Sequence, residues 1–133
     1  MSKADRHDAL RAYLDEARRL LGLTEWRVTV SRDAADLEAW ADIDPHTQAN
    51  SAELRVSADF WRQTPERQRE ILAHELTHLI TCRADQVVDH LEEPLGKLAW
   101  SVFAPQYETV AEQAVDRVSL LLAPLLPLPR LPR

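Results

Sequence analysis

The chain has a single cysteine, Cys82, so it cannot form an internal disulfide bond, and it lacks the paired Cys-x-x-Cys motifs of zinc ribbons. This cysteine usage does not require an oxidising compartment. No apolar run approaches the roughly 18 residues that a membrane-spanning helix needs. Residues 1–20 are charged throughout and lack the apolar centre of a secretory signal peptide. We therefore expect a cytoplasmic protein without a membrane partner.

Basic residues are also scarce. The 16 lysines and arginines are outnumbered by 22 aspartates and glutamates, which gives a net charge of -6 and a pI near 5.3. Because nucleic-acid binding depends on Lys and Arg contacts with phosphates, we expect no nucleic-acid partner. The hydrophobic share of 45% is that of ordinary globular proteins, and 133 residues suffice for one domain with a core of its own.

Periodic apolar residues define the first half of the chain. Residues 4–21 place apolar side chains on one helical stripe, and Gly22 supplies a helix stop. Segments 25–31, 37–43 and 52–56 alternate apolar and polar residues, as half-buried strands do. The link at 44–51 is rich in turn-forming residues, which favours a hairpin between the second and third strands.

Helices dominate the second half. Thr64, Pro65 and Glu66 form a helix start, with a capping hydroxyl, a proline in the first turn and an acid near the positive end of the helix dipole. A further helix is expected over 105–123, whereas Pro94 and Gly96 prevent a clear assignment of 84–104. This order predicts an α+β fold: an N-terminal helix, a three-stranded, mainly antiparallel sheet and two further helices. We expect one domain over 1–123 and a Pro-rich tail over 124–133 that is extended and frayed by default.

The stretch ILAHELTHLI (71–80) carries three proton-active side chains, His74, Glu75 and His78, in an otherwise apolar helical run. Buried polar groups cost free energy unless a partner satisfies them. Residues four apart share a helix face, so both imidazoles can reach one tetrahedral cation, with Glu75 offset toward its water. This is the His-Glu-x-x-His arrangement, in which the carboxylate is the general base of metal-assisted hydrolysis. The alternative is a pair of core histidines satisfied by hydrogen bonds.

A catalytic zinc site needs a third protein ligand and an open position. The extended zincin pattern would need Gly and His at positions 81 and 84, where this chain has Thr81 and Ala84. Glutamate is the next choice, and Glu108 and Glu112 are both available. Glu112 and Asp116 lie one helical turn apart beside an apolar stripe, where inward carboxylates need partners. Metal binding by Glu112, with Asp116 accepting the outer N–H of a ligand histidine, would satisfy both; Glu108 remains a competitor.

His74-Glu-Leu-Thr-His78 followed by Glu112-x-x-x-Asp116 resembles the thermolysin-like gluzincin metallopeptidases. The resemblance covers two helices rather than the chain, and the predicted element order is similar to that of minimal gluzincin domains in bacterial and phage genomes. It implies a zincin-like fold in which His74, His78 and Glu112 bind Zn²⁺. It further implies that Glu75 is the general base and that Asp116 orients His74.

The leading hypothesis is therefore a zinc-dependent peptidase that acts on a peptide or protein substrate. By the resemblance, the strand at 52–56 would be the edge to which an extended substrate adds. His90, Tyr107 and Arg83 are candidates for stabilising the oxyanion, and Cys82 is better explained as a packing residue. A second hypothesis is a non-catalytic, metal-stabilised interaction or toxin–antitoxin-like module. A third is a protease for DNA-associated proteins, against which the acidic balance and the missing zinc ribbon count.

Overall fold

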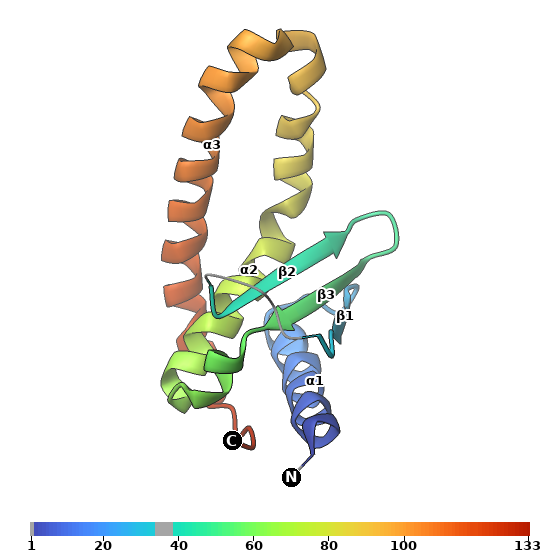
Figure 1. The fold of residues 1–133 in the computed structure, drawn as a ribbon, viewed down its shortest axis with the longest axis vertical. Helices are drawn as coiled ribbons and strands as arrows, with labels where there is room; N and C mark the ends of the chain where they lie inside the picture. The colour runs from blue at the N-terminus through green and yellow to red at the C-terminus, as the bar shows by residue number, and fades with distance from the viewer. Residues whose placement is uncertain (1, 34–38) are drawn as a thin grey trace.

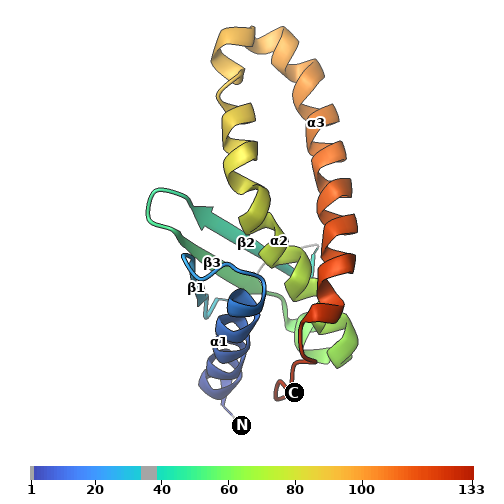
Figure 2. The same ribbon diagram turned by 180° about the vertical axis from the view of Figure 1, so that it is seen from behind.

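The computed structural model describes residues 2–33 and 39–133. Within them, a three-stranded sheet and three α-helices confirm the α+β class. Figures 1 and 2 show a body, made by the sheet, α1 and the start of α2, from which α2 and α3 project as a long helical hairpin. The elements are α1 (Lys3–Leu20), β1 (Arg27–Val30), β2 (Ala41–His46), β3 (Ser51–Val56), η1 (Ala58–Arg62), α2 (Pro65–Asp89), α3 (Glu92–Leu122) and η2 (Ala123–Leu125).

Helix α1 forms where the apolar stripe predicts it. The Ser2 hydroxyl accepts the Asp5 backbone N–H at 3.3 Å and the Asp5 carboxylate accepts the Ser2 N–H at 3.1 Å, which is a capping box. After the helix, Gly22 has φ +71°, and the backbone hydrogen bonds around it close a Schellman motif. The buried stripe of the helix consists of Leu10, Leu14 and Ala17.

The sheet is mixed, so the prediction of a mainly antiparallel sheet is wrong. Its strand order is β1-β3-β2, with β3 antiparallel to β2 and parallel to β1. The turn between β2 and β3 makes a hairpin, which forces that pair to be antiparallel. β1 joins the other edge of β3 in the same direction, a choice that strand periodicity does not encode.

The second strand lies later in the chain than predicted. Residues 34–38, which include the start of the expected strand at 37–43, lie outside the described residues. β2 begins at Ala41 and continues through Pro45 to His46, where the turn starts. Pro45 is opposite Ala52 and is tolerated because β2 is an edge strand, where a missing N–H need not interrupt the ladder.

The two long helices pack side by side. α2 starts at Pro65 as predicted, and the Thr64 hydroxyl accepts the Arg67 backbone N–H at 3.2 Å. It runs to Asp89, and α3 begins after a short turn, so residues 84–104 belong mostly to helices. Gly96 interrupts the first turn of α3 with φ 80° and ψ 169°. Pro105, the expected start of the last helix, lies inside α3, which ends near the predicted position.

The core lies between α1, the sheet and the first half of α2, and the C-terminal tail packs against it. Leu126 is 2% exposed, and the Tyr13 hydroxyl donates a 2.8 Å hydrogen bond to the Pro127 carbonyl. Arg69 also donates to the Leu126 carbonyl, at 3.3 Å. The tail is therefore docked rather than frayed, because its leucine and proline side chains cover apolar surface of the body. Among the described residues, no helix is both long and apolar enough to cross a membrane.

Candidate metal centre

The two motif histidines occupy the half of α2 that packs against the body. Leu72 and Leu76 on the same helix are fully buried and hold α2 against the sheet and α1. This packing turns the adjacent helix face, with His74 and His78, toward α3. Both side chains are mostly buried, with relative exposures of 21% and 28%.

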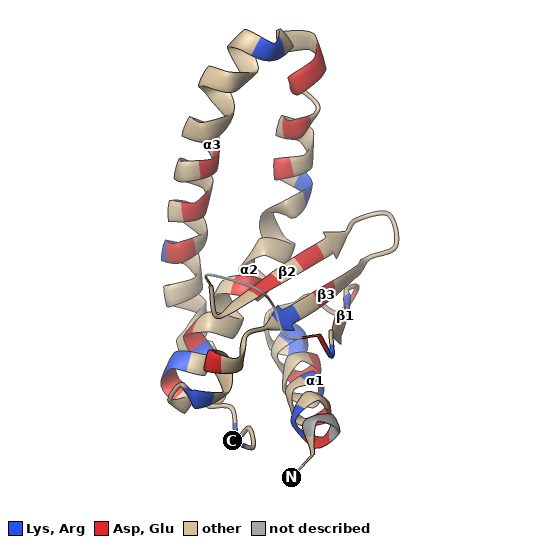
Figure 3. Ribbon diagram, viewed as in Figure 1, with Lys and Arg blue, Asp and Glu red and all other residues tan. Residues whose placement is uncertain are grey.

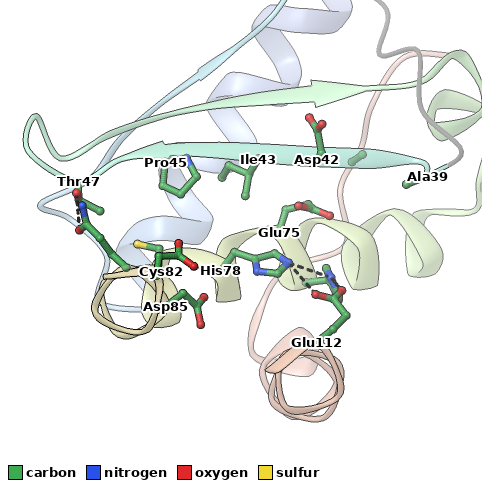
Figure 4. A pocket seen from close by; sticks show the side chains of 14 residues that line it. Ala39, Asp42, Ile43, Pro45, Thr47, Glu75, His78, Cys82, Asp85 and Glu112 are labelled. Carbon is green, nitrogen blue, oxygen red and sulfur yellow. Dashed lines mark hydrogen bonds and ion pairs between the residues drawn. The ribbon is translucent and has the colours of Figure 1, made fainter. Parts of the chain in front are cut away.

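Glu112 of α3 meets both histidines. Its carboxylate oxygens lie 2.8 Å from His74 Nε2 and 3.6 Å from His78 Nε2. The two Nε2 atoms are 3.3 Å apart, and one donor atom from each of the three residues lies within 4.8 Å of the others. Figure 4 shows Glu112 approaching the pair from α3, across from β2. The structure thus brings the three predicted ligands into one cluster.

The donor set fits a tetrahedral divalent cation. Two ligand atoms at 2.0–2.1 Å from a tetrahedral zinc ion are separated by about 3.3–3.4 Å. The Nε2 separation of 3.3 Å matches this spacing, whereas the Glu112 oxygens lie closer to His74, at 2.8 Å, and farther from His78, at 3.6 Å. Two imidazoles and one carboxylate are also a ligand set used in catalytic zinc sites. Glu108, the competing ligand, is exposed and does not belong to the cluster.

Asp116 lies behind His74. Its Oδ1 is 2.9 Å from His74 Nδ1, the ring nitrogen that points away from Glu112. With its proton on Nδ1, His74 would donate to this carboxylate and keep the Nε2 lone pair for a cation. Asp116 therefore occupies the position from which it can orient His74, one helical turn after Glu112.

The electrostatics of the site favour neutral groups at Glu75 and His78. Burial, reinforced by the negative charges of Glu112 and Asp42, raises the pKa of Glu75 to about 8. Burial also lowers the pKa of His78, although the Glu112 carboxylate opposes that shift. Neutral imidazole is the form that binds a metal.

Two adjoining cavities open on either side of the cluster. One has a volume of about 560 Å³ and extends between β2 and the second half of α2. The other, of about 590 Å³, extends along Trp40, Ile71 and Leu120. His74 and Glu75 line both cavities, and Figure 4 shows Glu75 between α2 and β2. Together they form a cleft that passes the cluster.

The strand beside this cleft is β2, so the expectation that residues 52–56 form the substrate edge is wrong. β3, which contains these residues, is the central strand. Ala41, Asp42 and Ile43 of β2 line the cleft instead. The order of the strands along the chain does not show that β3 is central. β3 becomes central because β1 pairs with the edge of β3 that β2 leaves free.

The predicted oxyanion candidates do not line either cavity. The Tyr107 hydroxyl donates to Asp85 at 2.7 Å, and Arg83 donates to Asn50 while its guanidinium stacks on a tryptophan of the body. His90 follows the end of α2 and is exposed. Cys82 packs partly against the core, as expected, and also lines the first cavity.

Sequence reasoning missed several acidic residues of the cleft. Asp42, Asp85 and Asp89 all line the first cavity, although none of them is among the residues that the sequence predicts at the site. Asp85 follows His78 by two helical turns and thus shares its helix face, a signal that would have found it. Asp42 could not be found in this way, because its pairing with Arg55 and its position beside α2 depend on the sheet.

Comparison with known proteins adds no relative. No protein-family model, curated protein or solved structure gives a significant match to this chain.

Proposed function

We propose that this chain is a zinc-dependent peptidase of the gluzincin type, with a zincin-like fold and Glu75 as its general base. The observation that carries the proposal is the convergence of His74, His78 and Glu112 from two helices, with Asp116 behind the first histidine. A pair of structural core histidines would not need an exposed glutamate from another helix to meet both rings beside an open cleft.

The two histidines and Glu112 would hold Zn²⁺. When bound, zinc supplies Lewis-acid chemistry, since it polarises a carbonyl and makes water more acidic. Asp116 keeps the His74 ring in the orientation and tautomer that present Nε2. The charge of a bound cation would also favour the ionised carboxylate of Glu75. It would thus lower the pKa that burial and Glu112 raise.

Glu75 is suited to proton transfer. It is 8% exposed and lines both cavities, and without a cation its pKa is raised to about 8. A bound cation would lower this pKa and leave the carboxylate ionised, so that it could accept a proton near neutral pH. In peptide hydrolysis it accepts a proton from the attacking water and returns it to the amine of the leaving group. The edge strand β2 offers backbone groups along the cleft to an extended substrate.

The test compares wild type with Glu75→Gln, measuring bound zinc by elemental analysis and cleavage of unfolded casein. We expect wild type to bind one zinc ion and cleave, and the variant to keep zinc but lose about 10²–10⁴-fold in rate. Glu66→Gln, an exposed glutamate on the same helix, is the matched control and should retain activity.

Each other outcome has a clear meaning. Full activity in Glu75→Gln would refute its role as the base, and failure of wild type to bind zinc would refute the metal site. Zinc binding that stabilises the fold without any cleavage would favour the non-catalytic, metal-stabilised module. Cleavage only in the presence of DNA would favour a protease for DNA-associated proteins.

A further inference from the structure

A third cavity lies apart from the cleft and is lined by basic residues. It has a volume of about 350 Å³, within the usual range of small-molecule sites. Its walls come from the start of α1, the segment after β1, the end of β3, η1 and the C-terminal segment. None of its lining residues lines the cleft beside the metal cluster. Figures 1 and 2 show both chain ends on the side of the body away from the hairpin.

Four arginines line this cavity: Arg6, Arg32, Arg62 and Arg133. Asp33 is the one carboxylate among the lining residues that the structure describes. Asp59, which does not line the cavity, forms an ion pair with Arg62 at 3.2 Å. Within the described chain, the other three guanidiniums form no ion pair. Four arginines therefore share a small concave space, where the carboxylates of Asp33 and Asp59 offset only part of their positive charge.

The concentration of charge contrasts with the rest of the protein. The chain carries a net charge of -6, so its overall field repels anions. At physiological ionic strength this field is screened beyond about 8 Å, and a local group of arginines dominates close to its own surface. Figure 3 shows mainly acidic positions on the hairpin, whereas the body carries acidic and basic positions side by side.

Two buried apolar side chains also line the cavity. Val56 and Trp61 are 4% and 6% exposed, and the Arg6 guanidinium stacks on the Trp61 ring at 4.7 Å. This stacking restrains one arginine before a ligand arrives, which lowers the entropy cost of binding. His7 also contacts the Trp61 ring, edge to face at 5.6 Å.

We propose that this cavity binds a small molecule that carries phosphate groups. Guanidinium groups donate paired hydrogen bonds to phosphate oxygens. A phosphate presents oxygens in several directions, and the arginines approach from α1, η1 and two further segments. The negative charge of the ligand offsets the mutual repulsion of the arginines. This site is independent of the proposed peptidase function, because it shares no residue with the cleft.

The experiment titrates the full chain with inorganic pyrophosphate and follows backbone and tryptophan indole signals by NMR. Saturable shifts are expected at the Trp61 indole and at the amides of residues 6, 32 and 62. Arg6→Gln combined with Arg32→Gln should weaken pyrophosphate binding by about tenfold to a hundredfold, since hydrogen bonds between charged groups are lost. Arg133→Gln tests the same site without disturbing the stacking on Trp61.

The matched control combines Arg11→Gln with Arg27→Gln, which removes the same charge from exposed positions outside the cavity. It should bind pyrophosphate like wild type. Equal loss in the control, shifts confined to the cleft, or no saturable shifts at all would each overturn the proposal. Binding of citrate but not pyrophosphate would overturn the assignment to phosphate. Thermal unfolding of each variant checks that the fold is retained.

Discussion

The body and the hairpin of this protein are built differently. In the body, apolar side chains from α1, the sheet and the first half of α2 meet in one core. In the arm, defined here as residues 80–110 of the hairpin, only Ala104 is buried in this fully described stretch. Large apolar side chains there face solvent, and Leu98 is 82% exposed. The arm is held together mainly by contacts between its two helices, such as the bond from Tyr107 to Asp85.

This difference explains how the candidate metal centre is assembled. The core holds the helix that carries His74 and His78, whereas Glu112 returns on α3 after the chain has passed through the arm. The position of the carboxylate therefore depends on the pairing of two helices with little core of their own. Body and arm should respond differently to the same substitution, and the predictions below test that difference.

The largest effect is expected from a core leucine. Leu72 is 0% exposed, so Leu72→Ala should lower the free energy of unfolding by about 2–5 kcal/mol, through lost burial and the cavity left behind. The same substitution at Leu98, on the arm, should change it by less than about 0.5 kcal/mol. Urea denaturation of both variants measures the contrast. A comparable loss at Leu98 would mean that the arm is covered by a partner or by a second copy.

The next largest effect is expected on the affinity for zinc. Glu112→Ala should weaken zinc binding by more than about 100-fold, because even the loss of an outer partner of a ligand costs about 10–100-fold. Glu108→Ala, one helical turn earlier on the same helix, should leave the affinity unchanged. Competition with a zinc chelator measures both. A large loss of zinc affinity in Glu108→Ala, with none in Glu112→Ala, would identify Glu108 as the third ligand.

A smaller effect is expected at the glycine of the arm. Gly96 has φ 80° and ψ 169°, a region that side chains disfavour, so Gly96→Ala should cost about 1–3 kcal/mol through backbone strain. An added Cβ would meet no atom within 4 Å, which excludes a packing clash. Hydrogen exchange should accelerate in the arm and stay unchanged in α1. Equal acceleration in both would show that body and arm unfold as one unit.

The smallest effect is expected where the tail meets the body. Tyr13→Phe removes the hydrogen bond to Pro127 and should cost about 0.5–1.5 kcal/mol. Burial, partly offset by the charge of Arg69, raises the pKa of the Tyr13 hydroxyl to about 12. The folded state holds this proton more tightly than the unfolded state does. The protonated hydroxyl therefore stabilises the fold fully below about pH 10, and this stabilisation is lost as the pH rises through 12. In Tyr13→Phe, the free energy of unfolding measured by denaturation should no longer fall between pH 10 and 12. The same fall in wild type and variant would contradict the assignment to Tyr13.

Local signals predicted the parts of the fold that short segments decide. The stripe of α1, the cap at Thr64 and the turn before β3 each depend on residues within a few positions of one another. The assignment failed for 84–104, because Pro94 lies in the first turn of α3, where proline is tolerated, and only Gly96 breaks the helical backbone before the helix resumes. It also failed for the tail, whose prolines favour an extended chain but give no sign of the surface that it covers.

The sequence alone determined that His74 and His78 share one helix face beside an apolar face, because helix geometry sets the direction of residues four apart. It favoured Glu112 over Glu108 as the third metal ligand but could not place either carboxylate beside the histidines. The tertiary structure brought Glu112, and not Glu108, to His74 and His78 and made β2 the strand beside the cleft. Both depend on packing between segments distant in the chain, where contact is set by the fit of whole surfaces rather than by local periodicity.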